Sequence, residues 1–118
     1  MNAGHSYYYD EKGYEKRVYS GSLTRGGDVI YTHSIDPKSP KFMLSDFIIV
    51  EFTTAVHSEL IEIYEQKYDL KFETHPLGNQ SICKFRVQNK KVSIETANKI
   101  MENEAVRSSY PDWIMLVR

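Results

Sequence analysis

The sequence contains few of the residues that build covalent frameworks or chemical sites. A single cysteine, Cys83, among 118 residues excludes an internal disulfide framework. Its position between strand-like residues predicts a thiol buried in the core and not a nucleophile. The four histidines are scattered with no partner at metal-ligand spacing: His5, His33, His57 and His75. We therefore predict no metal site and no cofactor.

Catalytic motifs are also missing. The sequence has no G-x-S-x-G nucleophile pattern, no phosphate-binding glycine loop and no glycine-rich turn between a strand and a helix. The pair Gly26-Gly27 is typical of a plain loop. These absences predict that the protein is not an enzyme and has no catalytic residues.

An excess of charge of one sign is lacking as well. The chain carries 15 Lys and Arg against 16 Asp and Glu, a formal net charge of −1, which gives no electrostatic basis for binding nucleic acid. The apolar run "FIIV" is too short to span a membrane. The first residues show neither the charged nor the apolar region of a secretion signal. We predict neither nucleic acid nor a membrane as partner.

Residues 1–46 are rich in tyrosine and in turn residues. "SYYYDEKGYEKRVYS" reads as two strand-prone runs around a turn, which predicts a β-hairpin. "VIYTHSI" predicts a further strand, and "DPKSPKF", with two prolines, predicts a linker. Residues 1–46 are therefore expected to form an N-terminal β-rich extension and linker.

From Phe47 onward, strand and helix patterns alternate. "FIIVEF", "LKFETH", "ICKFRV" and "AVRSSY" predict strands, and the inward face of the first could be either alternate set. Helices are expected near 57–67 and 94–103, with Ser93 as N-cap of the second. The expected buried stripes are Val56, Leu60, Ile63, Tyr64 and Tyr68 on the first helix, and Ile94, Ala97, Ile100 and Met101 on the second.

The order β-α-β-β-α-β predicts an α+β fold of the ferredoxin-like, split β-α-β kind over residues 47–118. In this plan a four-stranded antiparallel sheet carries both helices on one face. The other face of the sheet stays free to bind a partner.

The same segment resembles the N-terminal prodomain of subtilisin-like serine proteases, of the inhibitor-type, fervidolysin-like group. The likeness covers roughly residues 47–113 and depends on the order and spacing of elements, above all "ANKIMENEAVRSSYPDW". The matching positions are Val50 and Phe52; Ser58, Leu60, Ile61, Ile63 and Tyr64; Leu77 and Asn79; Ala97, Asn98 and Ile100; Val106, Tyr110 and Pro111.

The resemblance implies a propeptide that acts as intramolecular chaperone and inhibitor of a subtilisin-like protease domain, in cis or in trans. It implies an extracellular or periplasmic location as part of a secreted pro-enzyme. Such prodomains lay the open sheet face on the protease and run their C-terminal tail through its active-site cleft.

The chain ends in an apolar tail after one proline, with the only tryptophan at its start. The resemblance implies that this tail binds the protease, with Arg118 in the primary specificity pocket and Val117, Leu116 and Met115 in the next three subsites. The protease-binding residues are thus expected to be Trp113, Ile114, Met115, Leu116, Val117 and Arg118.

Two alternatives remain open from the sequence. The tail could be a strand or edge cover of its own domain, with Trp113 and Ile114 packed under the N-terminal hairpin. The domain could instead be a ferredoxin-like small-ligand or regulatory module with the tail in its own core, although Thr53-Thr54 stands where such a module would carry glycines. An RNA-binding variant lacks support, since Lys84 and Arg86 are too few cations for a sheet surface of that kind.

Overall fold

The computed structural model describes residues 3–9, 16–23, 29–32 and 41–116. They form two α-helices and nine strands in the order β1 Ala3–Tyr9, β2 Lys16–Leu23, β3 Val29–Thr32, β4 Lys41–Met43, β5 Phe47–Phe52, α1 Ser58–Tyr68, β6 Leu70–Thr74, β7 Ile82–Val87, α2 Ser93–Met101, β8 Val106–Pro111 and β9 Ile114–Leu116. The prediction of an α+β fold with two helices and an antiparallel sheet is confirmed.

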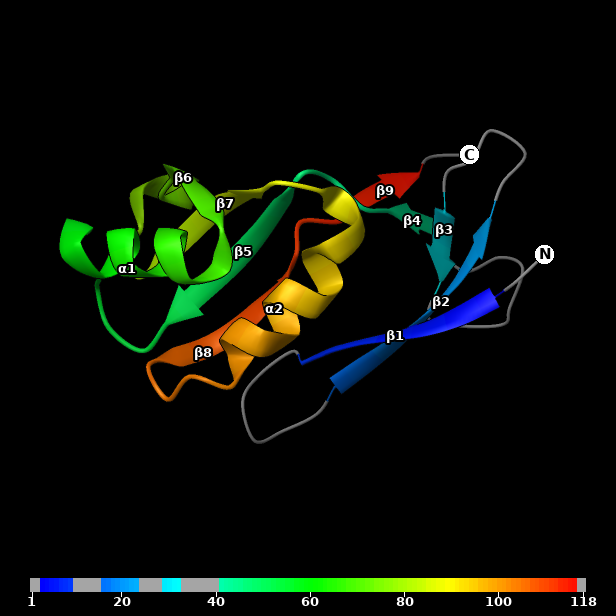
Figure 1. Cartoon of the computed structure of the whole chain (residues 1–118), viewed down its shortest axis with the longest axis horizontal. Helices are drawn as coiled ribbons and strands as arrows, with labels where there is room; N and C mark the ends of the chain where they lie inside the picture. Colours follow the sequence, from blue (N-terminus) through cyan, green and yellow to red (C-terminus); the bar gives the residue numbers. More distant parts are fainter. Residues whose placement is uncertain (1–2, 10–15, 24–28, 33–40, 117–118) are drawn as a thin grey trace.

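Four strands at one end of the nine-stranded sheet lie in the order β6-β7-β5-β8, and every neighbouring pair is antiparallel. Ile49 of β5 lies opposite Lys84 of β7 on one side and opposite Tyr110 of β8 on the other. Figure 1 shows α1 in front of β6 and β7, and α2 in front of β5 and β8. We call these four strands and two helices the core domain.

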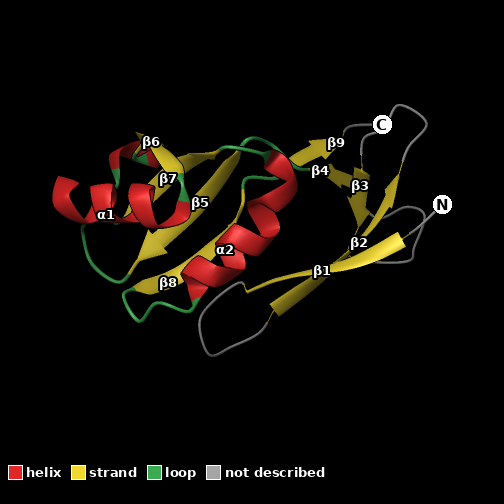
Figure 2. Cartoon of the chain, in the orientation of Figure 1, coloured by secondary structure: helices red, strands yellow, loops and turns green. Residues whose placement is uncertain are grey.

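An apolar core lies between the helices and the strands β6, β7, β5 and β8. On β5 the buried side chains alternate with partly exposed ones, so that Ile48, Val50 and Phe52 face the helices. Phe85 of β7 and Ile100 of α2 are fully buried in the same cluster. The strand and helix layers are plain in Figure 2. This packing decides which of the two alternate sets of β5 points inward.

The predicted buried stripe of α1 is wrong at one position. Ile63 is 57% exposed, whereas Ile61 is 8% exposed and belongs to the core. Successive helical residues turn by about 100°, so Ile63 lies roughly 200° away from Ile61. Ile61 and Tyr64 are buried one turn apart, with Leu60 and Tyr68 partly buried against the same core. The stripe of α2, in contrast, is confirmed at Ile94, Ala97, Ile100 and Met101.

Ser93 does not cap α2 as predicted. It is the first residue of the helix, and the N-cap position is Val92, whose side chain makes no capping bond. The Ser93 hydroxyl is buried and donates backward to the Lys90 carbonyl oxygen over 2.8 Å. A 3₁₀ turn at Lys90–Val92 comes directly before the helix and takes the place of a simple cap.

The sheet continues beyond β8 through β1, β2, β3, β4 and β9. β1 and β2 pair antiparallel from Ala3↔Ser22 to Tyr9↔Lys16, and the expected turn of the hairpin lies outside the described residues. β1 joins β8 at one pair, Tyr9↔Ser109. Within the described segments, neither helix has the length and apolar character needed to cross a membrane.

Part of the predicted linker is a strand. Lys41–Met43 forms β4, which pairs antiparallel with β9 at the opposite end of the sequence. Such a three-residue strand exists only because of its partner, so local sequence cannot reveal it. The proline-bearing remainder of the predicted linker, residues 36–40, lies outside the described residues.

Candidate functional site

The face of the core sheet that points away from the helices is built by the other alternate set of strand residues. On β5 these are Phe47, Ile49 and Glu51, all partly exposed. The register places Phe47 opposite Arg86. We call this surface the open face, and its accessible members from β5, β7 and β8 are Phe47, Ile49, Glu51, Ile82, Lys84, Arg86 and Tyr110. Ser108, opposite Glu51, lies on the same face but is buried.

Two cations on β7 lie against the Phe47 ring. The Lys84 Nζ is 4.3 Å and the Arg86 Cζ is 4.5 Å from the ring centroid. Such contacts are worth about 0.5–1 kcal/mol where the groups are exposed. They hold the two long side chains along the sheet and cover part of the ring with positive charge.

Carboxylates surround the same two cations. Lys84 Nζ is 3.3 Å from Asp112 Oδ2. Arg86 reaches Asp46 over 3.7 Å and Glu73 over 3.8 Å. These side chains are partly exposed, between 29% and 57%, so each pair adds about 0–1 kcal/mol. Their arrangement makes the open face a mixed surface, in which apolar side chains of β5 lie among cations and carboxylates.

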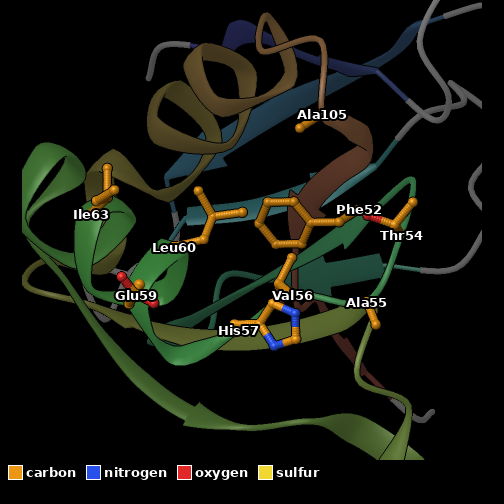
Figure 3. Close-up of a pocket in the computed structure, with 9 residues that line it drawn as sticks. All are labelled: Phe52, Thr54, Ala55, Val56, His57, Glu59, Leu60, Ile63 and Ala105. Atoms are coloured by element: carbon orange, nitrogen blue, oxygen red, sulfur yellow. The ribbon is translucent and has the colours of Figure 1, made fainter.

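A shallow hollow of about 340 Å³ lies at one end of the core domain, beside the β5–α1 loop. Figure 3 shows the Phe52 ring at its centre, with Leu60 and Val56 near the ring and the side chains of His57 and Glu59 beside them. The loops around it are joined by main-chain bonds from Thr53 to the Ala105 carbonyl and from Val56 to the Gln80 carbonyl. The hollow is at the lower end of the size range of small-molecule sites.

Cys83 is fully buried, as the sequence predicts. Burial raises the pKa of its thiol from 9.0 to about 11, so the thiol is protonated at neutral pH and is a poor nucleophile. Its nearest polar side chain is His75, with Nδ1 3.9 Å from Sγ and 2.9 Å from the Ile82 carbonyl oxygen. In the described part of the chain, no three His, Cys, Asp or Glu side chains gather as metal ligands would.

The tail, which the resemblance to subtilase prodomains implies to be protease-binding, is paired with its own chain. β9 lies antiparallel to β4, with Phe42 opposite Met115 and Met43 opposite Ile114. The Trp113 ring meets the Phe42 ring edge to face at a centroid distance of 6.1 Å. This pairing corresponds to the alternative in which the tail is a strand of its own domain, with β4 and not the N-terminal hairpin as the contact.

The side chains of β9 nevertheless remain accessible. Ile114 is 49% exposed and Met115 is 59% exposed, while Trp113 and Leu116 are partly exposed. Val117 and Arg118 lie outside the described residues. Binding of these six residues to a protease stays a prediction, and an extended tail in a cleft would require β9 to leave β4.

Most positions that carry the resemblance to subtilase prodomains lie in the core. Val50, Phe52, Ala97, Ile100 and Val106 are buried. Four positions are exposed, namely Ser58, Ile63, Leu77 and Asn79, and Leu77, in the turn between β6 and β7, also has a positive φ of 57°. The shared pattern therefore describes mainly how the domain packs, and the open-face residues are not part of it except for Tyr110.

The sequence alone does not predict which residues form the open face. Both alternate sets of "FIIVEF" contain apolar side chains, so β5 alone does not show which set faces the helices. The usable signal is on β7, where Lys84 and Arg86 alternate with buried Cys83 and Phe85. The chain matches no family model, and no curated protein or solved structure is detectably similar to it.

Proposed function

We propose that this protein is a propeptide-like inhibitor and folding chaperone of a subtilisin-like serine protease, and that it hydrolyses nothing itself. The observation that carries the proposal is the open face, a sheet surface of interleaved apolar and charged side chains whose reverse side holds both helices. Such a surface suits a protein partner of similar extent better than a small ligand.

The order of the core strands supports the finer fold assignment that the proposal needs. The sequence β6-β7-β5-β8, all antiparallel, is the order expected of a ferredoxin-like split β-α-β domain. Both helices cover one face in that plan, which agrees with their position in Figure 1. The partner would be a subtilisin-like protease domain, in cis or in trans, and the place of action extracellular or periplasmic.

Binding of the open face to the protease would account for both the chaperone and the inhibitor activity. A large, mostly parallel sheet folds slowly, because its pairings are non-local. A partner that binds the forming protease through a ready-made surface stabilises the folded form. The same partner then blocks the mature enzyme until it is removed. An interface of standard size, on the order of 1,600 Å² in total, is sufficient for tight binding.

Titration of the purified protein into a peptide-substrate assay of a broad-specificity subtilisin tests the proposal. We expect loss of protease activity at micromolar concentration or below, and no substrate turnover by the protein alone. Full protease activity at micromolar protein, with both a general subtilisin and a protease encoded beside this chain, would contradict it.

A second candidate function has an observation of its own. The hollow beside the β5–α1 loop lies where a ferredoxin-like regulatory module would hold a small ligand, and β9 is paired within its own domain as that alternative expects. The hollow offers apolar surface around Phe52 and few polar groups to orient a ligand. A thermal-shift screen with small apolar carboxylic acids tests this function. It would be favoured if a compound raised the melting temperature of the protein in a saturable way and if Leu60→Trp, which fills the hollow, abolished that rise.

A further inference from the structure

The chain is held firmly at the point where β8 ends. The Ser45 hydroxyl donates to the Asp112 carbonyl oxygen over 2.6 Å and accepts from the Phe47 amide over 3.1 Å. The Asp112 amide donates to the Phe47 carbonyl oxygen over 2.9 Å, and Lys84 pairs with the Asp112 carboxylate. These contacts fix the exit of the core domain at Asp112 and form what we call the exit clamp.

Beyond the exit clamp the chain bends into a three-residue strand. The Trp113 amide donates to the Pro111 carbonyl oxygen over 3.0 Å, which marks a sharp turn between β8 and β9. β9 then follows β4 for three cross-strand pairs, ending at Lys41↔Leu116. The Phe42–Trp113 ring contact adds to these pairs. β9 lies at the end of the strand order, so β4 is its single neighbour among the described strands.

β9 has half-exposed side chains and pairs with β4 over only three residues, so β4 and a protease cleft would compete for the same strand. This inference rests on the proposed function. A cleft that pairs with an extended strand and fills side-chain subsites encloses that strand and leaves no room for β4. We propose that β4 is a latch, which occupies β9 in the free protein and must release it before the tail can enter the protease cleft. The exit clamp is the fixed point about which the tail swings.

A latch of this kind weakens inhibition without touching the protease. The apparent dissociation constant rises by the inverse of the fraction of molecules with a free tail. The three cross-strand pairs and the Phe42–Trp113 contact all favour the paired form, so β9 is released in only a minor fraction of the free protein. The latch therefore lowers the apparent affinity of the tail by about tenfold or more.

A reversible cross-link tests the latch. Phe42 and Met115 are direct cross-strand partners, so their Cα atoms lie within the range that a disulfide spans. The double variant Phe42→Cys, Met115→Cys is closed with oxidised glutathione and opened with dithiothreitol, and subtilisin inhibition is compared between the two forms. Because both forms carry the same side chains, the comparison isolates the pairing. Parent protein under the same treatments is the control, since its only cysteine is buried.

We expect the closed form to inhibit at least tenfold more weakly than the opened form. Loosening the latch should act in the opposite direction. Phe42→Ala removes the contact with Trp113 and should tighten inhibition by about two- to tenfold, whereas a purely structural role of Phe42 predicts weaker inhibition. Equal inhibition by closed and opened forms, or weaker inhibition by Phe42→Ala, would overturn the latch while leaving the proposed function standing. If the parent protein itself fails to inhibit, the proposed function fails and the latch falls with it.

Discussion

Two isoleucines on α1, two positions apart, have different surroundings. Ile61 is 8% exposed and packs in the core cluster, whereas Ile63 is 57% exposed. Removing three methyl or methylene groups from a buried site costs transfer free energy and leaves a cavity. The same removal from an exposed site changes little. The contrast makes the packing of α1 testable at single residues.

Ile61→Ala should lower the free energy of unfolding by about 2–3 kcal/mol. Ile63→Ala is the matched control on the same helix and should change it by about 0.5 kcal/mol or less. Urea titration followed by far-ultraviolet circular dichroism measures both. A larger loss for Ile63→Ala than for Ile61→Ala would mean that α1 packs by its other face.

The buried thiol of Cys83 predicts a pH dependence. Its pKa is raised from 9.0 to about 11 in the folded state because burial disfavours the thiolate. The native protein therefore holds this proton more tightly than the unfolded chain. Its contribution to stability is fully present below pH 9 and is lost as the pH rises toward 11.

We expect this loss to be on the order of 2 kcal/mol, measured as the difference between parent and Cys83→Ala in urea unfolding at pH 8 and at pH 10.5. The pKa of Tyr64 is also raised by burial, but Tyr64 is present in both proteins and its effect cancels. A constant difference between the two proteins across this pH range would show that the thiol is already accessible to water.

At the scale of elements, a charged side chain joins α1 to β6. The Glu65 carboxylate accepts the Phe72 main-chain amide over 2.7 Å. Hydrogen bonds to charged groups contribute about 1.5–3 kcal/mol, and loss of the acceptor would also leave a partly buried amide without its partner. Glu65→Ala should therefore lower the free energy of unfolding by about 1–2 kcal/mol, and hydrogen exchange at the Phe72 amide should speed up.

Glu62→Ala is the matched control, because Glu62 is on the same helix and exposed. We expect it to change stability by about 0.5 kcal/mol or less. Equal effects of the two substitutions would indicate that the Glu65 contact does not hold α1 against the sheet.

The elements of the core domain could be predicted from sequence where the pattern is periodic over several residues. "ICKFRV" alternates cleanly, and its buried set of Cys83, Phe85 and Val87 is as expected. α2 shows its stripe in the same way. The prediction of Ser93 as the N-cap of α2 is wrong because a 3₁₀ turn at Lys90–Val92 precedes the helix and shifts the cap by one residue. Local propensity does not contain that information.

The paired ribbon of β4 and β9 could not be predicted, for a physical reason. Each strand has three residues, and they lie more than 70 positions apart in the chain. The prolines before Lys41 indicate a loop by every local rule. Such short pairings are decided by where the core domain brings its two ends together, here at the exit clamp between Ser45 and Asp112.

At the scale of the whole molecule, the two faces of the core sheet have different surroundings. One face is filled by α1, α2 and the apolar core. The other holds Ile49 at its centre, between Lys84 and Tyr110. The central proposal is therefore that a protease domain binds on the open face. An acid placed at its centre should disrupt that contact and leave the helical side intact.

The most direct test compares subtilisin inhibition by the parent protein, by Ile49→Asp on the open face and by Ile63→Asp on the solvent side of α1. Loss of one well-packed apolar contact and burial of an unpaired carboxylate should weaken inhibition by Ile49→Asp by about 30-fold or more. Ile63→Asp should inhibit like the parent, with circular dichroism showing that both variants are folded. Unchanged inhibition by folded Ile49→Asp, or a selective loss in Ile63→Asp, would contradict binding through the open face.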